Sequence, residues 1–342
     1  MLTRRRVRIV HDGPCVRWRN GLRCIAVCLL LTSGAAWPRL DASAASPSEA
    51  PPARRIVSLN PSLTAIILAL GARDSLVGVD DFSARQQANA KGIPAVGGLF
   101  NPSLESVVAL RPDLVVLVPS VEQRDFRRRL EALGVRVSVF ANIHFDEVLE
   151  NIDRLGALVG REAQARARLH AVAEARKAIE HATAGRHRPR TVLILQRDPI
   201  FIVGSGSFID EMLRSAGGNN LGSQFDEAYP RVAAEWLVAA APEVLIDFSP
   251  EALSGVAYWN RWPSLPAVQN GRVLAIEPER VTLPGPYLDR ALELLAGALH
   301  GPALRDAALD SSRAASASQD GVADTSALPD AHSLEAAGIR AR

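Results

Sequence analysis

Cysteine is nearly absent from this chain. Its 342 residues include only three cysteines, Cys15, Cys24 and Cys28, and all of them lie close to the N-terminus. If that region is removed after export, as predicted below, the mature protein contains no cysteine. Disulfide bonds and thiolate-ligated metal sites are then excluded. A chain of this length can bury a large hydrophobic core, so it does not need covalent cross-links.

Sequence motifs of the common enzyme and metal-binding classes are also missing. The chain contains no Walker phosphate loop, no G-x-S-x-G nucleophile elbow and no H-E-x-x-H zinc motif. None of the seven histidines pairs with another at the spacing that metal ligands require. The run Gly204-Ser205-Gly206-Ser207 could hold an anion before a helix, although a simple turn is the preferred reading. We therefore predict no catalytic residue, no resident metal ion and no cofactor.

A surplus of charge of one sign is lacking as well. The chain carries 39 Lys and Arg residues against 37 Asp and Glu residues, which gives a net charge of only +2. The surplus of arginine lies near the N-terminus rather than along a patch of groove size. Nucleic acid is therefore not an expected partner.

The one long apolar run lies close to the N-terminus. It reads LRCIAVCLLLTSGAA from Leu22 to Ala36, follows an arginine-rich segment, and is too short for a comfortable membrane span. Ala42-Ser43-Ala44 offers the small residues of a cleavage site. We therefore predict a signal peptide over residues 1–44 and export to the periplasm. A lipid anchor on Cys28 is the weaker alternative, because bulky Val27 precedes it and the apolar run continues beyond it.

A long helical pattern occupies the middle of the chain, from Ala141 to Thr183. Apolar residues recur there at steps of three and four. Asn142 is the predicted N-cap. Glycine is unfavourable in a helix interior by about 1 kcal/mol, so Gly160 is expected to divide the pattern in two. The second piece, from about Glu162 to Ala182, would be about 30 Å long at about 1.5 Å per residue.

One motif occurs on both sides of this helical segment. It reads PSLESVVALRPDLVVL at residues 102–117 and RVAAEWLVAAAPEVLID at residues 231–247. When the copies are superimposed, Glu105 meets Glu235 and Pro112 meets Pro242. Each copy predicts a short helix, a proline and an apolar strand. The repeat therefore predicts two similar lobes.

Short apolar runs alternate with helical patterns on both sides of the central helix, as in parallel α/β proteins. We predict an α/β fold in which two similar lobes with mainly parallel sheets are bridged by a single long helix. The predicted segments are a linker (45–54), an N-terminal lobe (55–141), the bridging segment (142–184), a C-terminal lobe (185–302) and a disordered tail (303–342).

Aromatic residues make up only 5% of the chain, so their positions are informative. Many of them fall in the loops expected at the C-terminal ends of strands, which is where α/β folds bind ligands. Such residues can simply anchor their loops. Together they favour a cleft for a large, flat and partly apolar ligand with some anionic groups. The predicted ligand-binding residues are Asp81, Phe82, Arg85, Leu99, Phe100, Arg197, Tyr229, Trp259 and Tyr287.

The two repeated glutamates allow three readings. Glu105 and Glu235 could act as a general acid and base, but equivalent positions on two lobes are not expected to face one another closely. Each could merely favour the N-terminus of its own helix. They could also form a matched pair of exposed carboxylates that dock on a symmetric cationic partner.

The chain resembles the periplasmic substrate-binding proteins of ABC importers for cobalamin, ferric siderophores and haem. The resemblance runs from about Arg55 to Gly301. It is carried by the repeat and by RIVSLNPSLT (55–64), ALGARDSLVGV (69–79), VGGLFNPSLESVVALRPDLVV (96–116), LGALVG (155–160), DPIFIVGSGSFIDEMLRSAGGNN (198–220) and LPAVQNGRVLAIEP (265–278).

The resemblance implies a binding protein rather than an enzyme, with Glu105 and Glu235 engaging the two permease subunits of an importer. It is strongest to the cobalamin-binding branch, and it implies a monomer. Departures at Ala65, Phe82 and Tyr287 lie in the presumed cleft, so a siderophore or haem held by Arg85 and Arg197 remains the alternative ligand. An exported enzyme or sensor on the same scaffold is the less favoured reading.

Overall fold

The computed structural model describes residues 51–120, 123–301 and 304. The chain divides into a unit of residues 1–49 and a unit of residues 50–342, and every feature reported below belongs to the second unit. The predicted signal peptide, Cys28 and nearly all of the predicted tail lie outside the described residues. Among the residues described, no helix is both long enough and apolar enough to cross a lipid bilayer.

The N-terminal half forms a four-stranded parallel sheet in the order β2-β1-β3-β4. Its strands are β1 (Ile56–Ser58), β2 (Leu76–Val79), β3 (Leu114–Leu117) and β4 (Val137–Val139). The helices that accompany it are α1 (Pro61–Ala69), α2 (Asp81–Gln86), α3 (Leu104–Ala109) and α4 (Gln123–Ala132). These strands read as continuous apolar runs because each face of the sheet is covered. Ile56 and Val116 pack into one hydrophobic cluster, whereas Val57 and Val115 pack into another.

The C-terminal half forms a second sheet in the order β10-β9-β5-β6-β8, with β7 paired to β5. Its strands are β5 (Arg190–Arg197), β6 (Ile200–Ile202), β7 (Asn219–Asn220), β8 (Arg231–Val232), β9 (Val244–Asp247) and β10 (Val273–Ala275). The accompanying helices are α7 (Phe208–Ser215), α8 (Ala234–Ala240), α9 (Pro266–Gln269) and α10 (Leu288–His300).

This second sheet is mixed, and three of its five strand pairs are parallel. β6 is antiparallel to β5, and β8 is antiparallel to β6, while the pairs β5–β9, β9–β10 and β5–β7 are parallel. Only Asp198 and Pro199 separate β5 from β6. A two-residue loop permits a hairpin but not the long crossover that a parallel pair needs.

The predicted central helix is confirmed as two consecutive helices, α5 (Phe145–Val159) and α6 (Glu162–Thr183). The division occurs at Gly160, whose φ of 64° is left-handed and suits a glycine. The N-cap is His144 rather than the predicted Asn142. Glu147 explains this position, because its carboxylate accepts the N–H groups of Ile143 and His144, both at 2.9 Å.

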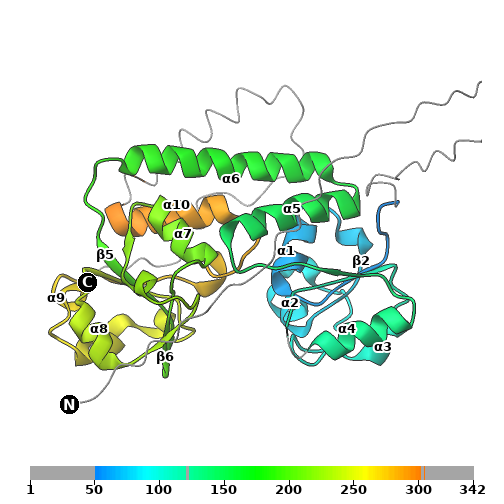
Figure 1. Ribbon diagram of the computed structural model, residues 1–342, viewed down its shortest axis with the longest axis horizontal. Helices are drawn as coiled ribbons and strands as arrows, with labels where there is room; N and C mark the ends of the chain where they lie inside the picture. The colour runs from blue at the N-terminus through cyan, green and yellow to red at the C-terminus, as the bar shows by residue number, and fades with distance from the viewer. Residues whose placement is uncertain (1–50, 121–122, 302–303, 305–342) are drawn as a thin grey trace, which may run out of the picture. The chain divides into compact units, whose positions relative to one another are not determined.

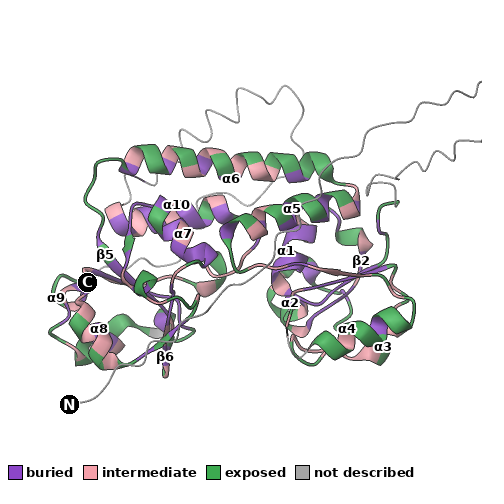
Figure 2. Ribbon diagram, in the orientation of Figure 1, coloured by how far each residue is buried: buried purple, intermediate pink, exposed green. Residues whose placement is uncertain are grey.

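α6 lies along α5 and α10 and also contacts α7 (Figure 1). Only one side of α6 is buried, along a row that includes Ala165, Val172, Ala175 and Ile179. Figure 2 shows that the rest of the helix surface is largely exposed. Because α5 follows the first sheet and α10 follows the second, this helix packs against elements from both halves of the unit.

The two copies of the sequence repeat form the same structure, α3–β3 and α8–β9. The match extends to a residue that the sequence comparison did not single out. Arg111 and Ala241 occupy equivalent positions, and both have φ of 45°. They are the only non-glycine residues with positive φ in the described part of the chain.

The same polar contacts occur in both copies, and they hold each copy against the first strand of its own sheet. Arg55 donates to the carbonyl of Arg111 at 3.0 Å, and Arg190 donates to the carbonyl of Ala241. The acidic residue of each copy closes the arrangement: Asp113 accepts the Arg55 N–H at 3.1 Å, and Glu243 accepts the Arg190 N–H at 2.9 Å. In each copy the proline lies just beyond the end of the helix, and the acidic residue fastens the copy to the neighbouring strand.

Candidate functional site

The segment after β2 forms helix α2 and places Asp81 and Phe82 in its first turn. Asp80 caps this helix: one carboxylate oxygen accepts the Ser83 N–H at 2.9 Å and the other accepts the Ser83 hydroxyl at 2.6 Å. Burial raises the pKa of Asp80, an effect that these hydrogen bonds oppose. Phe82 and Arg85 are exposed on the helix that results, whereas Asp81 is half-buried.

The loop before α3 carries Leu99 and Phe100. Its base is fixed by hydrogen bonds from Asp81 N to Gly97 O (3.0 Å) and from Ser103 N to Val96 O (2.8 Å). Gly97 has φ of 110°, and an added Cβ would lie 2.9 Å from the Asn101 carbonyl oxygen, so the tight fold of the loop requires glycine there. Phe100 is 68% exposed at this loop. The bond from Asp81 to Gly97 brings the Phe82 and Phe100 segments side by side.

On the second sheet, Tyr229 lies in a loop that packs against the bend Gly204–Ser207. Gly204 N donates to Ala228 O at 2.8 Å, and an added Cβ at Gly204 would lie only 1.9 Å from Glu227 O. Tyr229 is 37% exposed, yet its surroundings desolvate the phenol and raise its pKa to about 12. A phenol hydroxyl is neutral at ordinary pH, and this shift moves its deprotonation further above that range.

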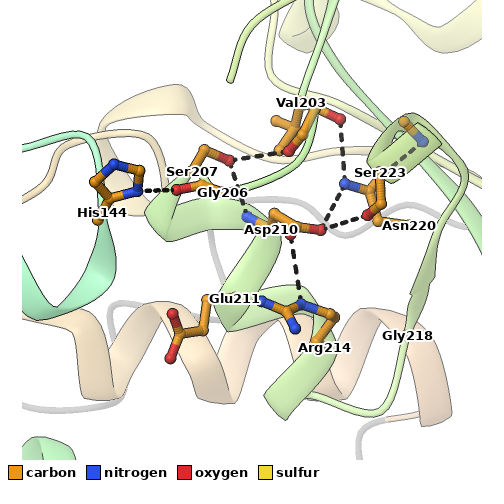
Figure 3. Close-up of polar contacts among 12 residues, drawn as sticks. His144, Val203, Gly206, Ser207, Asp210, Glu211, Arg214, Gly218, Asn220 and Ser223 are labelled. Atoms are coloured by element: carbon orange, nitrogen blue, oxygen red, sulfur yellow. Dashed lines mark hydrogen bonds and ion pairs between the residues drawn. The ribbon is translucent and has the colours of Figure 1, made fainter. Parts of the chain in front are cut away.

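The bend at Gly204–Ser207 is a turn with internal partners. The Ser207 hydroxyl accepts the Asp210 N–H at 3.2 Å and so caps α7, and the Phe208 N–H donates to Ile143 O at 2.7 Å. The Gly206 carbonyl lies 2.5 Å from Nδ1 of His144 (Figure 3). These bonds support the turn reading of the motif over the anion-binding one, and they tie the start of α5 to the start of α7.

A buried carboxylate below this bend organises the neighbouring loop. Asp210 is 2% exposed and accepts hydrogen bonds from Asn220 Nδ2 and Ser223 Oγ, each at 2.8 Å (Figure 3). Asn220 also donates to Val203 O at 3.2 Å. The network fixes the segment that leads into the Tyr229 loop, and it is an internal support rather than a ligand site.

Tyr287 precedes α10 and is 43% exposed. Its ring lies under two guanidinium groups, with Arg168 Cζ at 5.1 Å and Arg290 Cζ at 4.6 Å from the ring centroid. The adjacent turn approaches the first half of the unit, because a Cβ added at Gly285 would lie 3.8 Å from Ala65 Cβ. Gly285, the first residue of the Gly285–Tyr287 segment at which the chain departs from the family pattern, thus lies near residue 65, another such position.

Arg197 and Trp259 are engaged inside the second half. Arg197 is 8% exposed and its Nε lies 2.9 Å from Oδ2 of Asp247, which is completely buried. Trp259 is also completely buried and donates to the same carboxylate oxygen at 2.7 Å. Arg197 further donates to Gly255 O at 3.0 Å. We assign both residues to the support of the loop after β9 and leave them out of the proposed ligand surface.

The exposed aromatic side chains of the described residues are four in number, and all four belong to the predicted ligand-binding set. Two, Phe82 and Phe100, follow β2 of the first sheet, and two, Tyr229 and Tyr287, follow strands of the second sheet. Single exposed apolar side chains are common in proteins, whereas several gathered on one surface often mark a binding site. Each half of the unit therefore exposes two flat, apolar side chains.

Glu105 and Glu235 are exposed and lie in the first turns of α3 and α8. Ser103 caps α3 by accepting the Ser106 N–H at 3.2 Å, whereas Ala233 gives α8 no side-chain cap. Both carboxylates therefore stand at equivalent, solvent-facing positions. Within the described ranges, no group of three or more His, Cys, Asp or Glu residues could hold a metal ion.

Known proteins resemble this chain over most of the described region. The model of a family described as "Periplasmic binding protein" matches residues 56–279. The vitamin B12-binding protein of Vibrio campbellii is 28% identical over 241 residues, which cover 68% of this chain and 84% of that protein.

Solved structures agree with the sequence comparison. The periplasmic vitamin B12-binding protein of Vibrio cholerae matches with a TM-score of 0.65 and 26% identity, over 72% of this chain and 97% of that one. The apo form of a periplasmic haem-binding protein from a Roseiflexus species matches with a TM-score of 0.63 and 27% identity, over 75% of this chain and 99% of that one.

Proposed function

This chain belongs to the periplasmic binding protein family, and we propose that it captures cobalamin, or a closely related metal chelate, between its two lobes and delivers it to an ABC importer. Its architecture is that of the class III proteins of this family, in which a helix bridges two α/β lobes. In this role the protein binds and releases its ligand, acts as a monomer and needs no cofactor.

The observation that carries the proposal is the set of four exposed aromatic residues, two on each lobe. A corrin or porphyrin ring is large, flat and apolar on its faces, so aromatic side chains can cover it at little cost in conformational entropy. The neutral hydroxyl of Tyr229 adds a hydrogen-bond donor beside the ring. The resemblance to vitamin B12-binding proteins supports cobalamin as the ring.

A haem or ferric-siderophore ligand is the second candidate, and the exposed Arg85 favours it together with the haem-binding structural neighbour. Haem carries two carboxylates that require cationic partners. Arg197 was the second predicted partner, and its guanidinium already serves Asp247 inside the lobe. Because only one of the two predicted arginines is available, cobalamin, whose rim carries mostly neutral amide side chains, is favoured over haem as the ligand.

Glu105 and Glu235 are the proposed docking residues for the permease. Each is exposed at the same position of a repeated helix–strand unit, so the two carboxylates can meet two equivalent cationic sites on a symmetric partner. Delivery of the ligand then depends on the electrostatic match between Glu105 and Glu235 and two cationic sites on the permease. The proposal also includes export through the N-terminal signal, with a lipid anchor on Cys28 as the alternative.

Calorimetric titration of the purified protein with cyanocobalamin, haem and a panel of ferric siderophores tests the proposal. We expect saturable binding of one cyanocobalamin at micromolar or lower Kd. Binding of haem or a siderophore in place of cyanocobalamin would keep the receptor role and change the ligand. Failure to bind any of these chelates would refute the proposed function.

A further inference from the structure

The bridging helix reaches directly into the turn that carries Tyr287. Arg168 of α6 donates to the Pro286 carbonyl from Nη2 at 2.8 Å and from Nε at 3.2 Å. The same Nη2 lies 2.6 Å from Oδ1 of Asp289, in the first turn of α10. A single guanidinium group thus contacts the residue before Tyr287 and the second residue after it, and it also lies over the Tyr287 ring.

These contacts are shielded from solvent, which makes them stronger than ordinary surface contacts. The side chains of Arg168 and Asp289 are only 21% and 14% exposed. Charge-assisted hydrogen bonds with the planar guanidinium group also fix direction, because its N–H groups point along a rigid fork. The turn itself is tightly placed, since Gly285 and Pro286 are buried while Tyr287 remains exposed.

The element that carries Arg168 is suited to hold a turn in place. α6 packs on α5 and α10, so its position is set by both halves of the unit. Arg168 is separated from Pro286 by 118 residues, and no local sequence rule predicts their contact. The bridging helix therefore contacts the turn on both sides of Tyr287.

We infer that Arg168 is a positioning residue of the ligand site: it orients Tyr287 toward the ligand by clamping Pro286 and Asp289 to the bridging helix. The inference rests on the proposed function for the role of Tyr287 as a ligand contact. Arg168 itself acts through Tyr287 and needs no contact with the ligand.

The chain supplies a matched control on the same helix. Arg176 lies two turns further along α6, pairs with Glu180 and Glu211 at 2.9 Å each, and lies 5.0 Å from the Phe145 ring centroid. It therefore resembles Arg168 in partners and in geometry, but Phe145 is buried in the core. Replacing Arg176 perturbs the helix in a similar way and leaves the Tyr287 turn untouched.

The test is a double-mutant cycle in cyanocobalamin affinity, measured by calorimetry on Arg168→Met, Tyr287→Ala, the double variant and Arg176→Met. We expect Arg168→Met to weaken binding about tenfold, and Arg176→Met to change it less than about twofold. In the Tyr287→Ala background, Arg168→Met should add no further loss. Arg168→Lys keeps the charge but not the fork, so it should bind as weakly as Arg168→Met.

Hydrogen–deuterium exchange provides a second readout that does not require the ligand. Amides of residues 285–291 should exchange faster in Arg168→Met than in the wild-type protein or in Arg176→Met. Unchanged exchange, equal loss of affinity in the two arginine variants, or an undiminished effect without Tyr287 would each overturn the positioning role. A wild-type protein that binds no chelate would refute the proposed function, and the exchange comparison would still decide whether Arg168 orients the turn.

Discussion

Replacing Arg197 with methionine removes one member of a buried ion pair and keeps most of the side-chain volume. Asp247 has no solvent-exposed surface, so its carboxylate would lose its cationic partner in a place that water cannot reach. Breaking a buried pair in this way typically costs about 3–5 kcal/mol of stability. Asp247 keeps hydrogen bonds from Trp259 Nε1 (2.7 Å) and Ser249 N (2.9 Å), so we expect the lower end of that range, about 3 kcal/mol.

Thermal and urea unfolding of the Arg197→Met variant measures this loss. At about 2–4 °C per kcal/mol for a large domain, Tm should fall by about 6–12 °C. Arg176→Met is the control, because its ion pairs are more exposed and should contribute at most about 1 kcal/mol. An unchanged Tm combined with a loss of chelate affinity would refute the structural role and restore Arg197 as a ligand-binding residue.

Three further predictions concern docking, backbone packing and pH. Alanine at both Glu105 and Glu235 should abolish transport in a reconstituted importer while leaving chelate affinity intact; loss of affinity in that variant would contradict the docking role. Gly204→Ala should lower the free energy of unfolding by ~1–3 kcal/mol, and Tm with it, because the new methyl group would collide with the Glu227 carbonyl; a Tm equal to that of the wild type would contradict this clash. Tyr229 has a pKa of about 12 in the folded protein against 10.0 for a free phenol, so the folded state binds its proton more tightly. Its contribution to stability is present below pH 10 and is lost as the pH rises from 10 to 12, and Tyr229→Phe should remove that part of the alkaline decline in urea-unfolding free energy.

The elements of the fold follow from local features of the sequence. The predicted division of the central helix at Gly160 is confirmed by the left-handed backbone of that residue. Proline ends the helix of each repeat copy, and an apolar run follows it, so α3–β3 and α8–β9 appear where the pattern places them. These signals survive in the structure because they act over a few residues, through backbone sterics and the side-chain period of helices and strands.

The exposed aromatic residues of the candidate site were also accessible to sequence reasoning. Phe100, Tyr229 and Tyr287 lie in loops that follow strands or precede helices, and such loops stay at the surface. Phe82 lies in the first turn of the short helix that follows β2. A scarce residue type collected on loops is informative, because aromatic side chains are otherwise buried. Their common use in binding a chelate stays a prediction.

Only the tertiary structure decided which charged and aromatic residues are free to act. Arg197 is the last residue of β5 and Trp259 follows β9, so both lie near the C-terminal end of a strand, as predicted for ligand-binding residues. Both are nevertheless buried, because each forms a hydrogen bond with Asp247, which is 50 residues from Arg197 in sequence. Arg168 showed no functional signal in the sequence, and its contact with Pro286 spans 118 residues. The sequence by itself determined the elements and their repeat, because those depend on near neighbours. Whether a side chain is free to contact a ligand depends on its partners within the fold. A buried carboxylate must be hydrogen-bonded, and its partners can come from any part of the chain that the fold brings close to it.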